Sequence, residues 1–328
     1  MDSLFLPHRN LTNMLAEVRS RMTAGSGLST TLVVGPTGVG KTTLGNMQLR
    51  SLLSNYRVRI QENPAFIPAV MAEVDPADKG EINFVLLYNR LCAALLAPGS
   101  LGGFTADASD GQPMDAVKNA RLLLENALKE RKLKHLILDE AVHFTDSKTD
   151  PIEYGNLLKS LGKRGACNLL LLGAYGCERL VVATSQLSRR IGVVHYERYK
   201  ATDNDFKEYA KFVRSLVENM PYRFDIELAS RIEYLFEGTV GLPGSTADVL
   251  KDAAKRSYED GNKWSEEHLL KAMPSRAAHK KILTDTVRGE ATVQPYLQMA
   301  KEHEYVTEED ISLVVNMEAS KQTAGEFA

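Results

Sequence analysis

The chain has 328 residues and a mass of 36.3 kDa, with 40 Lys and Arg against 42 Asp and Glu, which gives a formal net charge of −2. Its hydrophobic content of 44% and charged content of 25% exclude a mainly disordered or fibrous chain. The near balance of charge, with a pI of about 6.4, excludes the overall signature of a strongly basic nucleic-acid binder but permits a local basic strip.

Apolar segments are too short for a membrane span or a secretion signal. No run of about 18 apolar residues occurs, and the first apolar stretch, Leu4 to Pro7, is shorter than a signal-peptide core. We therefore expect an intracellular protein with no membrane partner. The three cysteines, Cys92, Cys167 and Cys177, lie in apolar surroundings without metal-ligand spacing, which predicts buried free thiols and no disulfide framework.

The first 200 residues alternate between strand and helix patterns. Residues 1–25 predict a short arm and a helix, and the pattern then changes to β-branched and apolar runs separated by helical periods. The predicted strands are 30–34, 66–74, 135–138, 168–173 and 193–196, and the predicted helices are 41–53, 82–96, 114–130 and 152–163. This alternation predicts an α/β fold with a parallel sheet covered by helices.

Strand patterns stop after residue 196. Helical patterns at 203–217, 225–236, 245–258 and 265–273 predict a second, helical domain of about 70 residues. From Ser275 onward the chain is richer in charge and weaker in apolar periodicity, with helical candidates at 295–301 and 308–315. We expect a tail that is either partly ordered or folds on a partner.

A phosphate-binding motif follows the first strand of the alternating region. The segment from Gly35 to Thr42 matches G-x-x-x-x-G-K-[ST] and lies between a predicted strand and a predicted helix, as the motif requires. Its glycines let backbone N–H groups converge on phosphates, Lys41 would reach the β and γ phosphates, and Thr42 would hold Mg²⁺. The alternative is a glycine-rich turn without a ligand. The predicted nucleotide-binding residues are Gly35, Pro36, Thr37, Gly38, Val39, Gly40, Lys41, Thr42 and Thr43.

A second half of the site is predicted at the end of the strand His135–Leu138. Asp139 would lie near Mg²⁺, at the sheet edge where parallel sheets bind their ligands. Glu140 beside it would polarise a water for attack on the γ-phosphate, which suits ATP hydrolysis better than transfer to a small acceptor. Farther on, Ser188-Arg189-Arg190 is either a source of a charge-stabilising arginine for a neighbouring subunit or a solvated basic turn.

The order of these motifs resembles that of the AAA+ ATPases, and within them the TnsC/TniB-type regulators of bacterial transposition. The resemblance covers roughly residues 5 to 273. It is carried by Leu6-Pro7-His8, by Leu169–Gly173 followed by Glu178-Arg179-Leu180, by Gln186–Ile191, and by Glu237–Gly241 leading into Ala247–Ala254. It implies a P-loop AAA+ core with a C-terminal helical lid, divided as arm 1–25, core 26–200, lid 201–275 and extension 276–328.

The resemblance also implies a function in the bacterial cytoplasm. Such proteins assemble as a filament or ring on double-stranded DNA and link a target-selecting protein of the TniQ/TnsD kind to a transposase. ATP then lies between copies of the chain, so Arg190, or failing that Arg189, would act in trans. Lys79 matches the DNA-facing segment best and Thr105 is the second candidate, whereas the alternative for Lys79 is a solvated turn lysine.

Two departures from the AAA+ pattern predict slow or partner-stimulated hydrolysis. The strand ending Gly173-Ala174-Tyr175 lacks the Asn, Thr or Ser expected to sense the γ-phosphate, and Gly241–Ser245 stands where the lid often has an arginine. Two other functions remain open from the sequence. One is another DNA-associated AAA+ ATPase of the initiator or loader type, which shares every core motif. The other is a P-loop phosphotransferase, against which Glu140 and the helical lid argue.

Overall fold

The structure, a computed structural model, describes residues 6–23, 29–77, 80–96, 113–146, 154, 158, 167–182, 191–220 and 230–297. Contacts between residues divide the chain into one unit spanning Met1–Tyr296 and another spanning Leu297–Ala328. The helices and strands of the described residues all belong to the first unit.

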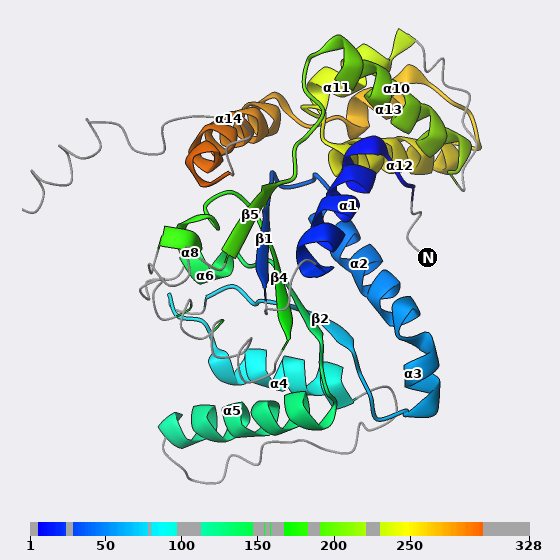
Figure 1. Cartoon of the computed structure of the whole chain (residues 1–328). Coiled ribbons are helices and arrows are strands. Elements are labelled where there is room, and N and C mark those ends of the chain that lie inside the picture. Colours follow the sequence, from blue (N-terminus) through cyan, green and yellow to red (C-terminus); the bar gives the residue numbers. More distant parts are fainter. Residues whose placement is uncertain are drawn as a thin grey trace, which may run out of the picture. The chain divides into compact units, whose positions relative to one another are not determined.

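A five-stranded parallel sheet forms the centre of the first unit, in the order β2-β3-β4-β1-β5. Its strands are short apolar runs that are buried because helices cover both faces of the sheet, as the sequence predicted (Figure 1). The register aligns Val34 of β1 with Gly173 of β4 and His195 of β5, so these strand ends meet at one edge. The strands are β1 Thr30–Val34, β2 Ala69–Glu73, β3 His135–Asp139, β4 Asn168–Gly173 and β5 Ile191–His195.

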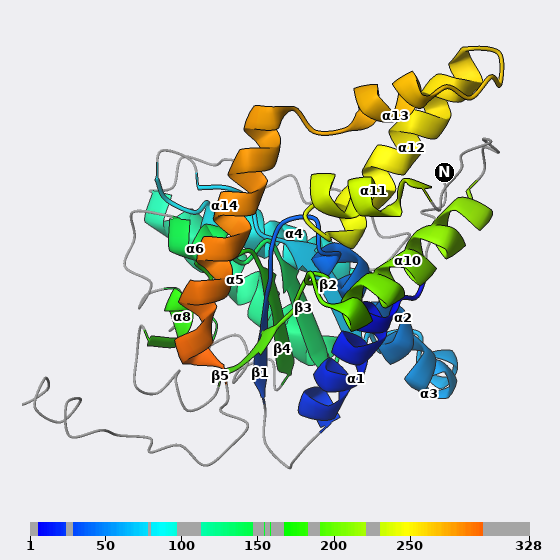
Figure 2. The same ribbon diagram turned by 90° about the horizontal axis from the view of Figure 1, so that it is seen from above.

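Helices cover the two faces of this sheet in separate groups. Helices α1 and α2 pack on one side, whereas α4 and α5 pack against each other on the side away from α2 (Figures 1 and 2). On α2 the buried residues Lys41, Leu44, Gln48 and Leu52 recur at helical spacing and face the sheet. The core helices are α1 Arg9–Thr23, α2 Lys41–Asn55, α3 Arg57–Glu62, α4 Phe84–Leu96, α5 Pro113–Glu130, α6 His143–Asp146 and α8 Arg179–Val182.

A helical subdomain follows β5 and has its own apolar core. Tyr209 lies at the centre of that core, where its ring meets Phe236 edge-on and its hydroxyl bonds to the Thr246 and Thr239 hydroxyls at 2.9 and 3.3 Å. Thr202 caps the first helix by accepting from the Asp205 N–H. The helices are α10 Asp203–Glu218, α11 Ile232–Gly238, α12 Pro243–Glu259 and α13 Glu266–Ala272.

One helix departs from the sequence interpretation, which expected weak order directly after Ser275. Ser275 instead caps an 18-residue helix, α14 Arg276–Val293, which ends in a single 3-10 turn, η2 Gln294–Tyr296. The buried residues of α14 are Thr286, Gly289 and Val293, so its packed face carries little hydropathy signal. Of the two helical candidates in the tail, 308–315 lies outside the described residues, and 295–301 lies outside them beyond residue 297.

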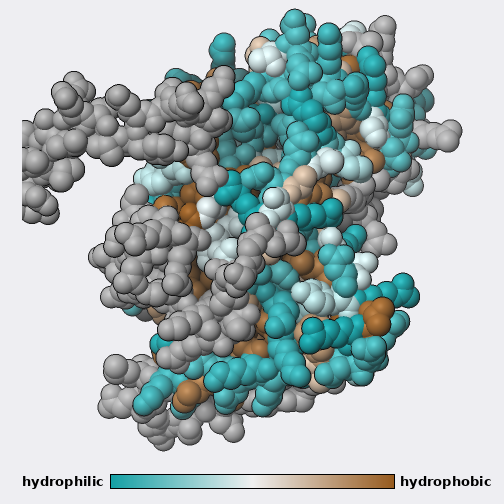
Figure 3. Space-filling model, in the orientation of Figure 1, coloured by the Kyte–Doolittle hydropathy of each residue, from teal (hydrophilic) through white to brown (hydrophobic). Residues whose placement is uncertain are grey.

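The surface matches the balanced composition. Hydrophilic residues cover most of the coloured face over α10–α13, with only scattered apolar groups (Figure 3). No helix among the described residues is both long and apolar enough to cross a bilayer.

Candidate nucleotide site

The loop between β1 and α2 has the conformation that a phosphate cradle requires. Gly38 and Gly40 adopt φ angles of +83° and +107°, a region that side chains with a Cβ rarely enter. A Cβ on Gly35 would lie 2.5 Å from the Tyr196 carbonyl oxygen. The loop leads directly into α2 at Lys41, so the first N–H groups of that helix have no acceptor within the helix and border the loop.

Lys41 is buried inside this loop. Its Nζ donates to the carbonyl oxygens of Gly35 and Pro36, each at 3.0 Å, and the residue is 7% exposed. Burial lowers the pKa of Lys41, and the carboxylates of Glu140 and Asp139 oppose that shift. The ammonium group is thus held by backbone carbonyls near two acids, a setting that an anionic ligand would complete.

Asp139 is the last residue of β3 and Glu140 follows it directly, as the sequence predicted. Asp139 is 4% exposed, and its Oδ1 accepts the Glu140 N–H at 2.9 Å. Glu140 has a φ of +54°, an uncommon conformation for a residue with a side chain, and the chain turns there into α6. The carboxylates of both acids favour the charged form of Lys41.

The helical subdomain touches the loop directly. The Gly244 N–H donates to the Gly38 carbonyl oxygen at 2.7 Å, and a Cβ on Gly244 would lie 2.5 Å from that oxygen. A Cβ on Gly38 would lie 2.6 Å from Ser245 Oγ. Pro243 occupies the first turn of α12, so the positive end of that helix dipole borders the loop.

A cavity of about 280 Å³ adjoins the loop on the α2 side. At its floor, Tyr196 is 1% exposed and its hydroxyl has no hydrogen-bond partner in the described part of the chain. That hydroxyl lies 3.4 Å from where a Cβ on Gly40 would stand. The cavity is lined by Leu6, His8, Leu11, Val39, Gly40, Thr43, Tyr196, Phe212, Leu216, Pro243, Gly244, Ala247, Asp248 and Lys251.

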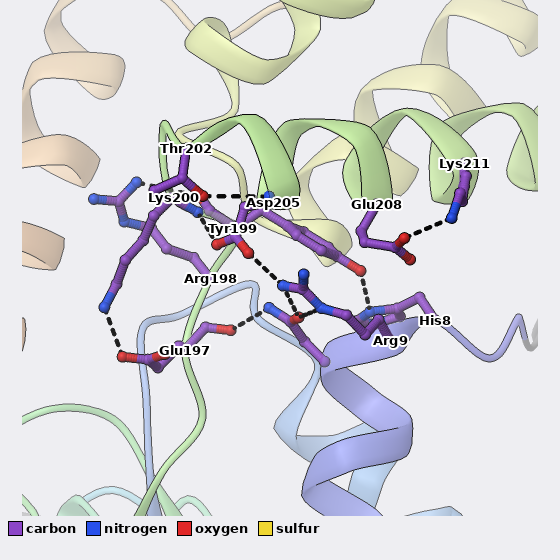
Figure 4. A network of polar contacts seen from close by, with 11 residues as sticks. His8, Arg9, Glu197, Arg198, Tyr199, Lys200, Thr202, Asp205, Glu208 and Lys211 are labelled. Atoms are coloured by element: carbon purple, nitrogen blue, oxygen red, sulfur yellow. Dashed lines mark hydrogen bonds and ion pairs between the residues drawn. The ribbon is translucent and has the colours of Figure 1, made fainter.

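The N-terminal arm is fastened to the helical subdomain beside this cavity. Arg9 pairs with Asp205 at 2.5 Å and lies over the Tyr199 ring, and His8 Nδ1 shares a 3.1 Å hydrogen bond with the Tyr199 hydroxyl (Figure 4). Asn10 donates to the Glu197 carbonyl oxygen. Burial, aided by the charge of Arg9, lowers the pKa of His8 to about 4, so its imidazole is neutral at pH 7.

The end of β4 carries no polar sensor, in agreement with the sequence. Ala174 and Tyr175 follow Gly173, and the Tyr175 hydroxyl bonds to His195 Nε2 at 2.9 Å. Tyr175 also packs against α14, where a Cβ on Gly289 would lie 1.9 Å from its ring. The end of β4 is therefore followed by an aromatic ring that contacts β5 and α14.

Four predicted residues lie outside the described part of the chain: Lys79, Thr105, Arg189 and Arg190. Conversely, sequence reasoning gave no role to Tyr196 or Gly244. Tyr196 directly follows β5, and the carboxyl ends of parallel strands are where ligands bind, so its position was the available signal.

Comparison with known proteins agrees with this geometry. Residues 24–181 match the family model described as AAA domain. No curated protein sequence matches the chain significantly.

Three solved structures have a similar fold at low identity. The Aeropyrum pernix ORC2 protein, in ADPNP-ADP complexes, has a TM-score of 0.56 and 17% identity over 84% of this chain and 71% of its own. The A. pernix ORC1 protein in complex with DNA has a TM-score of 0.56 and 16% identity, over 81% of this chain and 65% of its own, so this chain spans less than two thirds of it. Cdc6p from Pyrobaculum aerophilum has a TM-score of 0.54 and 15% identity, over 83% of this chain and 69% of its own. Residues 24–181 thus match the AAA domain model, and the chain has the AAA+ P-loop fold.

Proposed function

We propose that this protein is a DNA-associated AAA+ ATPase that binds ATP with Mg²⁺ and self-assembles on double-stranded DNA. The observation that carries the proposal is the phosphate loop from Gly35 to Thr43, with Lys41 buried inside it and Asp139 and Glu140 at the adjoining strand end. Nucleotide binding is the property that the AAA domain match implies.

The residues present fit a nucleoside triphosphate. The loop offers N–H groups and a buried cation to the phosphates, and the adjoining cavity offers the unpartnered Tyr196 hydroxyl to the ribose or base. Thr42 and Asp139 would hold Mg²⁺, which supplies positive charge to the phosphates when bound. Glu140 would orient the attacking water and accept its proton, and Lys41 would hold the β and γ phosphates.

Self-association would complete the site. We propose that Arg190, or failing that Arg189, reaches the phosphates of a neighbouring copy. DNA contacts are assigned to Lys79 and, second, to Thr105. With a formal net charge of −2, each copy would make only a few phosphate contacts, so affinity for DNA would arise from many copies joined through ATP. Lys79→Ala should then weaken DNA binding and flatten its salt dependence, whereas an unchanged salt slope removes Lys79 from the contacts.

Two finer functions compete within this class. The initiator or loader type is supported by the fold likeness to ORC and Cdc6 proteins, one of which was solved with DNA. A transposition regulator that recruits a transposase and a TniQ/TnsD-like target selector is supported by the motif order, including Gln186–Ile191 and Glu237–Gly241. A neighbouring gene for a transposase, followed by ATP-dependent capture of that transposase on DNA, would select the second.

The test is electron microscopy of the full chain with duplex DNA and a non-hydrolysable ATP analogue, together with a phosphate-release assay. We expect oligomers on DNA that require the nucleotide, and slow phosphate release without transfer to a sugar or nucleoside. Lys41→Ala should abolish assembly. Calorimetry that found no uptake of adenine nucleotide at saturating Mg²⁺ would overturn the proposal.

A further inference from the structure

Helix α14 is held firmly against the end of the sheet. Figures 1 and 2 both place it over α8 and β5. Gly289 meets the Tyr175 ring with no room for a Cβ, and Glu290 accepts from Arg198 Nε and Nη2 at 2.9 and 3.3 Å. Both side chains of that ion pair are less than one fifth exposed. Thr286 is also buried, so the helix has a defined rotation about its axis.

This rotation turns one face of α14 toward the phosphate loop. A cavity of about 670 Å³ has Pro36, Thr37 and Gly38 on one wall and α14 residues on the other. The α14 residues on that wall include Ile282, Asp285, Gly289 and Thr292, which recur at intervals of three or four and so share a face. Different loop residues line the two cavities: Pro36, Thr37 and Gly38 line this one, whereas Val39, Gly40 and Thr43 line the Tyr196 cavity.

Two arginines line this cavity, and only one is engaged. Arg179 donates to the carbonyl oxygens of Thr145 and Gly176, each at 3.1 Å. Arg288 is exposed on the wall and has no ion pair or hydrogen bond with any described residue.

Two of the acidic residues that line the same cavity already have polar partners. Asp285 pairs with Lys281 at 2.8 Å, and Glu178 is 3% exposed and accepts the Gly176 N–H. Asp248 of α12 also lines the cavity. Arg288 is therefore the uncommitted cation that faces the loop across the cavity.

We propose that Arg288 contacts the terminal phosphate of a triphosphate bound in the loop, in the same copy of the chain. This inference rests on the proposed nucleotide site. It assigns to α14, a helix outside the matched AAA domain, the task left open by Ala174-Tyr175 at the end of β4 and by Gly241–Ser245 in the helical subdomain. Arginine suits the task because its guanidinium is always charged and matches phosphate geometry with paired donors.

The proposal predicts discrimination between nucleotides. Arg288 would contact a group that ATP has and ADP lacks, so its removal should weaken only the triphosphate. Tyr196 is assigned to the ribose or base, which both nucleotides have, and should not discriminate in this way.

The experiment is isothermal titration calorimetry on the full chain with Mg²⁺ and no DNA, below the concentration at which it associates. Arg288→Gln is compared with wild type and with Lys280→Gln, which removes an exposed cation that does not line the cavity. We expect about tenfold weaker binding of a non-hydrolysable ATP analogue, ADP binding within about twofold, and partial recovery in Arg288→Lys, which keeps the charge but not the paired donors. Lys280→Gln should match wild type.

Equal effects on both nucleotides, or no effect on the triphosphate, would overturn the role of Arg288 while leaving the nucleotide site intact. Wild-type protein that bound neither nucleotide would overturn the proposed function itself. Because Arg288 is exposed, we expect Arg288→Gln to keep the wild-type melting temperature. Measuring that temperature for each variant separates a loss of nucleotide binding from misfolding.

Discussion

Removing the unpartnered Tyr196 hydroxyl should weaken nucleotide binding without lowering the free energy of unfolding of the free protein. The hydroxyl is buried without a partner in the described part of the chain, so the free protein bears its desolvation cost. Removing it in Tyr196→Phe should leave the free energy of unfolding unchanged or raise it by up to about 2 kcal/mol without nucleotide. If the hydroxyl bonds to ribose or base, the loss of about 0.5–1.5 kcal/mol should weaken ATP and ADP equally, by roughly two- to twelvefold.

Tyr209→Phe is the matched control. The Tyr209 hydroxyl is as deeply buried but bonds to Thr246 and Thr239, so its removal should lower the free energy of unfolding by about 0.5–1.5 kcal/mol and leave nucleotide affinity unchanged. Urea denaturation and calorimetry measure the two quantities. The reasoning is refuted if Tyr196→Phe destabilises the free protein as Tyr209→Phe does, or if it leaves both nucleotide affinities at the wild-type value.

Two further predictions concern hydrolysis and pH. Glu140→Gln should reduce phosphate release at least about 100-fold and hold ATP-bound oligomers on DNA, since the amide cannot accept the proton of water; release at the wild-type rate would contradict this. Burial lowers the pKa of both His8 and His135 to about 4, below the unfolded value of about 6.5. The unfolded chain therefore binds more protons between these values, and stability present above pH 6.5 should fall toward pH 4, by up to about 2 kcal/mol per histidine at pH 5. Urea midpoints that stay constant from pH 7 to pH 5 would show that these imidazoles are accessible.

The sheet was predictable because its strands are short, mainly apolar runs separated by helical patterns, which is typical of a parallel sheet covered on both faces. β1 and β4 begin and end where the sequence predicted. β5 begins two residues earlier than expected, because Gly192 interrupts its apolar run. Helix α3 has no buried residue and α14 buries Thr286 and Gly289, so neither shows the apolar stripe by which a helix is found in a sequence.

The candidate site likewise contains residues that a local sequence pattern marks and residues that none marks. The loop residues and Asp139-Glu140 are local motifs whose spacing carries their chemistry, so the sequence alone located them. His8 and Tyr196 line one cavity beside the loop and Arg288 lines the other, and all three come from distant parts of the chain. No short pattern marks such residues, because only the sheet order and the packing of α14 bring them near the loop.

The contact between the phosphate loop and α12 links nucleotide binding to the rest of the molecule. Gly38 and Gly244 meet with no space for a side chain on either, and one N–H···O bond of 2.7 Å joins them. The loop can shift on binding phosphate only if α12 moves with it or this bond breaks, at about 1 kcal/mol. Because α12 shares an apolar core with α10, and α10 holds the arm through Asp205 and Arg9, a shift of α12 acts on the arm as well. Movement of the helical subdomain and arm together is therefore the mechanical response that this packing favours when the loop changes shape.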